Sequence, residues 1–129
     1  MSQNSNKTLI AVVDDDPDIL STLRLAFEKE NYRVVTAESG VELLTKSLPA
    51  KPELILLDVM LPWTSGYDIC YTLKDEFDNC PVIMISALNQ RQDYERGFWS
   101  GADAYFTKPL DLDVLLERVQ ELIADRPAS

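Results

Sequence analysis

The chain has 129 residues, of which 46% are hydrophobic and 26% charged, and this composition suits one globular domain with a single core. Its formal net charge of −10 argues against direct binding to nucleic acid or to an anionic membrane, because phosphate groups select basic surfaces. The sequence contains no histidine, which excludes Ser-His and Cys-His catalysis and also a phosphohistidine on this chain.

The sequence also lacks the usual signs of export. No segment has the pattern of a secretory signal, and no apolar run approaches the roughly 18 residues of a membrane span. The two cysteines, Cys70 and Cys80, fit no zinc pattern, and we expect reduced thiols in or near the core. These features predict a cytoplasmic protein.

Apolar runs alternate with helical patterns along the chain. The polar residues 1–7 predict a flexible N-terminal tail, and residues 125–129 a C-terminal tail. Short apolar runs predict strands at 8–13, 32–37, 53–58, 81–86 and 104–106. Helical spacing and capping residues predict helices at 17–30, 39–47, 67–76, 92–100 and 112–123, with Asp16 and Asp111 as caps.

This alternation predicts an α/β fold in which residues 8–124 form one domain. Short apolar strands that alternate with helices give a doubly wound, parallel (βα)5 sheet with helices on both faces. We expect the flavodoxin-like strand order 2-1-3-4-5. In such sheets ligands bind beyond the carboxyl ends of the strands, where the strand order reverses, so the residues that end strands are the candidates for a site.

Charged and polar side chains gather at those strand ends. Asp14 and Asp15 end the first strand, Asp58 ends the third, Ser86 ends the fourth, and Lys108 follows the fifth. If the first and third strands are neighbours, three carboxylates converge on one crevice, and a hard divalent cation such as Mg²⁺ would offset their repulsion. The ammonium and hydroxyl groups could hold phosphoryl oxygens, so the set points to phosphoryl transfer onto a carboxylate.

Four segments in order resemble a known family. They read VVDDDPDI (12–19), LILLDVMLP (54–62) with Gly66, PVIMISA (81–87) and GADAYFTKPL (101–110). Over about residues 7–124 the chain resembles the receiver domain of bacterial two-component response regulators. The resemblance implies that Asp58 is the phosphoacceptor. It also implies a Mg²⁺ site formed by Asp15, Asp14 (largely through water), Asp58 and the backbone carbonyl of Met60.

The same resemblance implies how the phosphoryl group would be read. Ser86 would be the switch hydroxyl that moves toward it, and Tyr105 the aromatic that changes rotamer with Ser86. Lys108 would contact the phosphoryl oxygens, next to a cis bond between Lys108 and Pro109. A phosphoryl group adds roughly −1.5 to −2 charge, which shifts the population of a two-state loop and of a distant face. The resemblance places that face at about residues 92–123.

The resemblance also implies partners. The phosphoryl donor would be a histidine kinase or a phosphotransfer protein, and the face at 92–123 would contact a downstream protein or a fused output domain. The chain would be a monomer or a phosphorylation-dependent homodimer. Its own chemistry would be limited to Mg²⁺-dependent self-phosphorylation from phosphodonors and to autodephosphorylation.

Some positions depart from the family pattern or leave alternatives open. Met60 and Leu88 are apolar at positions that tune hydrolysis of the aspartyl phosphate, so we expect slow autodephosphorylation. Trp63 is bulky where the family more often has a small residue, and it would cover the site, present a partner surface or pack on neighbouring helices. Tyr94 and Phe98, four residues apart, are expected in the core.

Three other functions compete with this interpretation. A haloacid-dehalogenase-like phosphatase would use Asp14 as its nucleophile, but Pro17 follows closely, no cap domain fits, and no acidic pair follows the fourth strand. A flavodoxin-like flavin binder would need a Gly/Ser/Thr-rich phosphate loop where this chain has DDDPD. A receiver-like interaction module without phosphorylation would not need the full set of chemical residues.

Overall fold

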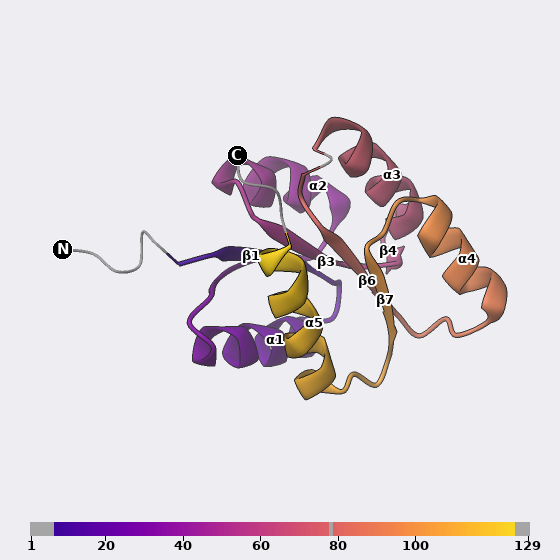
Figure 1. Ribbon diagram of the computed structural model, residues 1–129. Coiled ribbons are helices and arrows are strands. Elements are labelled where there is room, and N and C mark those ends of the chain that lie inside the picture. The colour runs from indigo at the N-terminus through magenta and orange to yellow at the C-terminus, as the bar shows by residue number, and fades with distance from the viewer. Residues whose placement is uncertain (1–6, 78, 126–129) are drawn as a thin grey trace.

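The computed structural model describes residues 7–77 and 79–125, and the predicted tails lie almost wholly outside this part of the chain. Its centre is a five-stranded parallel sheet of order β2-β1-β3-β6-β7 (Figure 1), which is the predicted 2-1-3-4-5 order. The strands are β1 (Leu9–Val13), β2 (Arg33–Ala37), β3 (Leu54–Asp58), β6 (Val82–Ser86) and β7 (Ala104–Thr107). The α-helices are α1 (Pro17–Lys29), α2 (Gly40–Glu42), α3 (Gly66–Glu76), α4 (Arg91–Trp99) and α5 (Leu112–Ala124).

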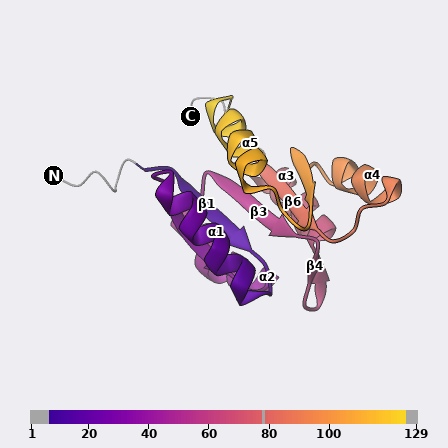
Figure 2. The ribbon, with the colours of Figure 1, turned by 90° about the horizontal axis from the view of Figure 1, so that it is seen from below.

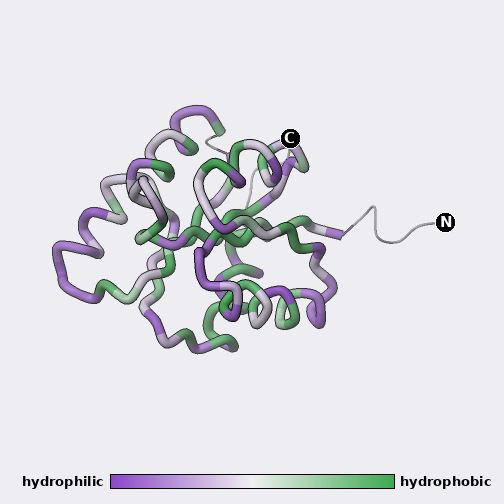
Figure 3. Tube along the Cα trace, turned by 180° about the vertical axis from the view of Figure 1, so that it is seen from behind, coloured by the Kyte–Doolittle hydropathy of each residue, from purple (hydrophilic) through white to green (hydrophobic). Residues whose placement is uncertain are grey.

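The sheet divides the core into two layers. Every residue of β1, β3 and β6 is buried, which explains why these strands read as unbroken apolar runs. On one face α1 and α5 pack against the sheet through Leu23, Phe27 and Leu115. On the other face α3 packs through residues such as Tyr67 and Leu73, together with Leu43, which directly follows α2. Figures 1 and 2 show the helices on the two sides of the sheet, and Figure 3 shows apolar residues along its centre.

Side chains cap the predicted helices at the expected ends. Asp16 accepts a hydrogen bond from the backbone of Asp18, and Asp111 accepts from Asp113 and Val114. These caps satisfy backbone N–H groups that have no partner inside a helix. They fix the points at which the chain leaves the strand ends, and therefore the directions of the loops that carry the site.

Two predicted segments differ from the structure. The helix predicted at 39–47 is α only in α2, continues as a π-helical turn, η2 (Leu43–Ser47), and ends in a 3-10 turn, η3 (Leu48–Ala50). The segment between the predicted strand at 53–58 and the predicted helix at 67–76, where we expected no regular element, contains a small antiparallel hairpin of β4 (Met60–Leu61) and β5 (Thr64–Ser65). Its strands are two residues long, too short to show an alternating pattern in the sequence.

The two thiols lie in or near the core, as expected. Cys70 is buried, Cys80 is half-buried, and neither forms a disulfide. No helix in the described part of the chain is both long and apolar enough to cross a bilayer.

Candidate functional site

Two neighbouring strands bring the acidic residues to one edge of the sheet. Strand β1 pairs in parallel with β3, and Val13 lies opposite Leu57 in the register. Asp14 follows Val13 and Asp58 follows Leu57, so the two aspartates lie side by side at the same edge of the sheet. The backbone N–H of Asp14 donates to the carbonyl of Ala37 at 3.0 Å, which ties the end of β1 to β2 as well.

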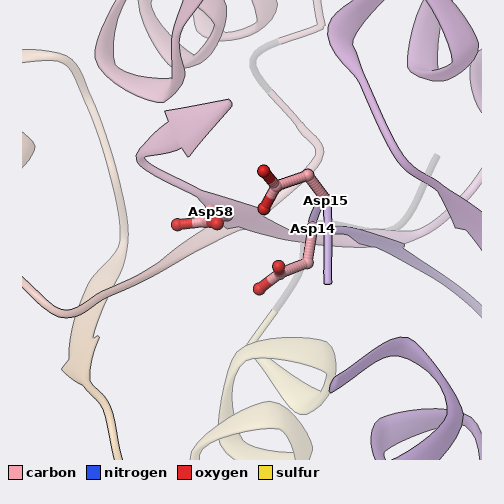
Figure 4. Close-up of side chains that lie close together, drawn as sticks. All are labelled: Asp14, Asp15 and Asp58. Carbon is pink, nitrogen blue, oxygen red and sulfur yellow. The ribbon is translucent and has the colours of Figure 1, made fainter. Parts of the chain in front are cut away.

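The three predicted carboxylates form a cluster. Asp14, Asp15 and Asp58 each offer an oxygen atom, and these atoms all lie within 4.8 Å of one another. Figure 4 shows the three side chains directed toward a shared space. Asp14 and Asp58 are only 2% and 3% exposed, whereas Asp15 is exposed, so the cluster is buried on one side and open on the other.

The ammonium group of Lys108 faces this cluster from the loop after β7. Its Nζ donates to Oδ2 of Asp14 at 2.9 Å and lies 3.6 Å from Oδ2 of Asp58. Its backbone N–H donates to the carbonyl of Ser86 at 2.8 Å, and the bond between Lys108 and Pro109 is cis. One cation therefore faces two buried carboxylates.

Burial and like charge set the protonation of Asp58. Loss of water contact, followed by the charge of Asp14, raises the pKa of Asp58 to about 6, although the Met60 N–H and Lys108 act in the opposite direction. Burial alone would lower the pKa of Lys108, but its hydrogen bond to Asp14 and the charges of Asp58 and Asp14 raise it above its ordinary value. Lys108 is therefore a fixed positive charge, and the carboxylates still exceed it in number.

A glycine keeps the chain close behind Asp58. A Cβ at Gly66 would lie 2.7 Å from the Cα of Val59 and would also overlap the carbonyl oxygen of Asp58. The N–H of Gly66 donates to the Val59 carbonyl at 2.7 Å, and the N–H of Met60 donates to Oδ1 of Asp58 at 3.2 Å. Residues 59–66 thus form a tight backbone bracket around the end of β3, and a side chain at position 66 would break it.

The predicted switch residues are joined by hydrogen bonds through Leu88. The buried hydroxyl of Ser86 accepts from the Leu88 N–H at 3.0 Å, and the carbonyl of Leu88 accepts from the Tyr105 hydroxyl at 3.0 Å. In this arrangement the Ser86 hydroxyl is bonded to its own loop, and the contacts of the described residues do not bring it to Asp58.

Tyr67 extends this network, and sequence reasoning missed it. Its hydroxyl oxygen lies 3.4 Å from that of Tyr105, and the hydroxyl donates to the carbonyl of Asp93, the third residue of α4, at 3.2 Å. Burial and the Tyr105 hydroxyl raise the pKa of Tyr67, so it remains a neutral donor. The sequence marked residue 67 only as the start of a helix, and its contact with a residue 38 positions away has no local signal.

Helix α4 leaves space for the Tyr105 ring. A Cβ at Gly97 would lie 2.7 Å from Cδ2 of Tyr105, and the ring of Tyr94 packs edge-on against Tyr105 at a centroid distance of 4.8 Å. The expectation that Tyr94 and Phe98 lie in the core is wrong. Tyr94 is 42% exposed although its ring contacts Tyr105, and Phe98 is 73% exposed and packs edge-on against Trp99. Helix α4 is too short and too polar to cover a full apolar stripe.

The remaining predicted positions lie around the rim. The side chain of Met60 is exposed, and that of Leu88 is half-buried. Trp63 is 97% exposed at the tip of the hairpin, so it does not pack on the neighbouring helices. The side chains of Met60 and Leu88 carry no group that could hold a water molecule in place beside Asp58.

The donor set suits a small, hard cation. Three carboxylates offer oxygen ligands only, without the nitrogen or sulfur donors that favour zinc. The exposed position of Asp15 leaves room for water, which Mg²⁺ usually keeps in its coordination sphere. The residues present therefore fit a magnesium ion, and three carboxylates facing one ammonium group leave the cluster short of positive charge.

Comparison with known proteins places this geometry in a family. The family model of the response regulator receiver domain matches residues 10–120. The chain is 39% identical over 116 residues to the DNA-binding dual master transcriptional regulator RpaA of Synechocystis, covering 88% of this chain and 48% of RpaA. It is 38% identical over 119 residues to the transcriptional regulatory protein ResD of Bacillus subtilis, covering 92% and 49%. The chain thus spans about half the length of these curated relatives.

Solved structures agree with the sequence comparison. A two-component response regulator from Clostridium difficile superimposes with a TM-score of 0.88 at 26% identity, over 92% of this chain and 98% of the other. The BeF3-activated receiver domain of DrrB, a Thermotoga maritima OmpR/PhoB homologue, superimposes with a TM-score of 0.85 at 36% identity, over 92% and 98%. Sheet order, strand-end chemistry and family match agree, and the chain belongs to the response regulator receiver domains.

Proposed function

We propose that Asp58 accepts a phosphoryl group and that this charge changes the surface formed by residues 92–123. The single observation that carries the proposal is the cluster of three carboxylates within 4.8 Å of one another, with the Lys108 ammonium 2.9 Å from Asp14 and 3.6 Å from Asp58. Repulsion among the carboxylates favours a bound cation, and the lysine provides a second positive charge for an incoming anion.

The metal site would be formed by Asp14, Asp15, Asp58 and the backbone carbonyl of Met60. When bound there, Mg²⁺ would supply positive charge against the phosphoryl oxygens. The chain's own residues orient the acceptor, because the Met60 N–H holds Oδ1 of Asp58 and leaves Oδ2 facing Lys108.

The reaction is a transfer onto a carboxylate oxygen. The bond between phosphorus and the donor's nitrogen breaks, a bond between phosphorus and an Asp58 oxygen forms, and the electron pair stays with the leaving imidazole. The donor would be a histidine kinase or a phosphotransfer protein, since this chain has no histidine of its own. Lys108 would hold the transferred group by charge and hydrogen bonding.

The response would pass from Ser86 to the α4 side of the molecule. The Ser86 hydroxyl accepts from the Leu88 N–H and can donate its own proton to a phosphoryl oxygen near Asp58. A move of this hydroxyl toward that oxygen would pull on Leu88, whose carbonyl also holds Tyr105. A move of the loop after β6, which contains Leu88, would therefore change the contacts that hold Tyr105 of β7 and the neighbouring helix α4. Both elements lie in the surface at 92–123. A downstream protein, a fused output domain or a second copy of the chain would bind there. Several relatives are named as transcriptional regulators, which favours an output of that kind.

The decisive experiment is phosphorylation with acetyl phosphate and Mg²⁺, followed by intact mass measurement and peptide mapping. We expect one added phosphoryl group on the wild type, mapped to Asp58, and none on Asp58→Asn. The same map tests the phosphatase alternative, for which the comparisons give no support, because that mechanism requires the phosphate on Asp14. An unmodified wild type, or a fully modified Asp58→Asn, would contradict the proposal.

The lifetime of the phosphorylated form is a further part of the proposal. Neither Met60 nor Leu88 carries a group that could orient water toward the phosphorus atom, so we expect slow hydrolysis. Loss of the added mass after removal of the donor measures this rate. Met60→Gln should shorten the half-life several-fold, and a wild-type half-life of seconds would count against this account.

A further inference from the structure

A second surface lies on the α2–α3 side of the molecule, apart from Asp58 and from the 92–123 face. A pocket of about 380 Å³ opens between α2, α3 and the β4–β5 hairpin, and its lining is mostly apolar. In Figure 2 the hairpin projects past the end of the sheet. We call this surface the hairpin pocket and define it by Val41, Leu44, Trp63, Asp68 and Ile69, which all line it.

Three apolar side chains of the hairpin pocket face solvent. Val41 is 68% exposed, Leu44 is 60% exposed, and the Trp63 indole is 97% exposed. A contiguous apolar patch of this kind marks a binding surface more often than chance exposure does. Tryptophan is also the residue type most enriched among the few side chains that dominate interface affinity.

The backbone at Trp63 supplies an independent sign. Pro62 and Trp63 form the two-residue turn between paired residues Leu61 and Thr64, and Trp63 has φ of 62°. Left-handed backbone is a position for glycine or asparagine, and a bulky side chain there is strained. The Trp63 side chain has almost no contact with the described residues that could offset this strain, which is the pattern expected of a side chain that contacts a partner.

The charge around the pocket selects the occupant. None of the eleven described lining residues is basic, and the carboxylate of Asp68 is exposed and forms no ion pair with another described residue. Glu38 and Glu42 flank the lining residues Ser39 and Val41 in the sequence. The two lysines nearest along the chain, Lys46 and Lys74, do not line the pocket, and Lys74 pairs with Asp103 at 3.0 Å. A second copy of this chain would add another net charge of −10, which opposes self-association.

We propose that the hairpin pocket binds a segment of a partner protein that buries one large apolar side chain between Leu44 and Trp63 and pairs a lysine or arginine with Asp68. The volume of the pocket suits one such side chain, and the indole beside it can also stack on a guanidinium or ammonium group. This surface does not use Asp58, so the proposal stands or falls separately from phosphorylation.

The test uses a leucine–lysine amphipathic peptide without tryptophan, titrated into the ¹⁵N-labelled full chain in Mg²⁺ and 0.1 M salt. A leucine–glutamate peptide with the same apolar positions serves as the charge control. Trp63 and Trp99 are the two indoles of the chain and are both exposed, so Trp99 is an internal reference. We expect the Trp63 indole N–H and the amides of Val41, Leu44 and Ile69 to shift, and Trp99 to stay unchanged.

Variants separate the pocket from general acidity. Leu44→Ser and Trp63→Gly should each weaken the peptide at least fivefold, and Trp63→Gly should keep or raise the melting temperature because it relieves the backbone. Asp68→Asn should weaken binding about threefold and reduce its salt dependence. Leu25→Ser is the matched control, because Leu25 is a 62% exposed leucine on α1 and should leave binding within twofold of the wild type.

Several results would overturn the proposal. They are equal binding of the two peptides, shifts spread evenly over the acidic surface, or equal losses from Leu25→Ser and Leu44→Ser. Shifts of the pocket residues on concentrating the chain without peptide would also overturn it, because they would make a second copy the occupant.

Discussion

At the scale of single residues, the site depends on an unfavourable arrangement of charge. Asp58 is 3% exposed, beside a second buried carboxylate, and its ionised form is destabilised. The same repulsion that costs stability in the metal-free chain favours a cation, because a divalent ion replaces repulsion with attraction. The carboxylates that would bind a cation therefore lower the stability of the folded chain, a trade-off that is common at functional sites.

Asp58→Asn should stabilise the metal-free protein at neutral pH. The folded-state pKa of Asp58, about 6, lies above its ordinary value of 3.8, so the folded protein binds a proton more tightly than the unfolded chain. This group therefore lowers stability as the pH rises from about 4 through 6, and the penalty is fully present above pH 6. Asparagine removes it, and we expect a gain of roughly 1–3 kcal/mol at pH 7.5.

Urea unfolding in EDTA at pH 7.5 and pH 5 measures this effect. The advantage of Asp58→Asn over the wild type should shrink at pH 5, where folded Asp58 is mostly protonated. Asp113→Asn, an exposed acid on α5, is the control and should change little at either pH. A variant less stable than the wild type at pH 7.5 would show that the contact with Lys108 outweighs the repulsion.

At the scale of secondary-structure elements, hydrogen bonds join α3, α4 and β7 through two tyrosines. Tyr67 comes from the first turn of α3 and donates to α4, while Tyr105 comes from β7 and donates to the loop after β6. Each hydroxyl has one proton and donates it to a backbone carbonyl. The two hydroxyl oxygens lie 3.4 Å apart, and neither has a second proton to donate across that distance. Tyr67 is thus a positioning residue for Tyr105 and α4.

Tyr67→Phe should loosen this connection. The change keeps the buried ring but leaves the Asp93 carbonyl without its donor, and we expect a loss of about 1–2 kcal/mol in the free energy of unfolding. The ring resonances of Tyr105 should also shift or broaden in NMR spectra, which a purely local loss would not cause. Tyr71→Phe on the exposed face of α3 is the matched control, and identical behaviour of the two variants would refute the role of Tyr67.

The elements also show what the sequence could and could not predict. Strands β1, β3 and β6 were predictable because strands buried on both faces are unbroken apolar runs, and the acids at their ends followed from parallel topology. The β4–β5 hairpin escaped prediction, since its strands are too short and a left-handed Trp63 contradicts propensity. The exposure of Phe98 and the bond between Tyr67 and α4 depend on tertiary packing, which local patterns do not contain.

At the scale of the whole molecule, net charge and cation binding should act together on stability. A free cation concentration one hundred times the dissociation constant adds about 2.7 kcal/mol when only the folded state binds. We therefore expect Mg²⁺ to raise the melting temperature of the wild type by several degrees, and EDTA to reverse it.

Controls separate the bound ion from general screening of the charge of −10. Sodium chloride at matched ionic strength should give a smaller rise, and the same rise in every variant. Asp15→Asn should lose most of the Mg²⁺ effect, whereas Asp113→Asn should keep it. A Mg²⁺ effect no larger than that of sodium chloride would show that the carboxylate cluster does not bind the ion.

The contact between Lys108 and Asp14 joins positions 94 residues apart. During synthesis Asp14 therefore emerges from the ribosome 94 residues before its lysine, so the site cannot be complete until the residues that follow β7 have been made. A truncated or still-growing chain that ends before β7 would carry the acidic residues without their lysine. Such a fragment would also lack β7 and α5, which complete the sheet and one helix layer, so we expect it not to present the assembled site.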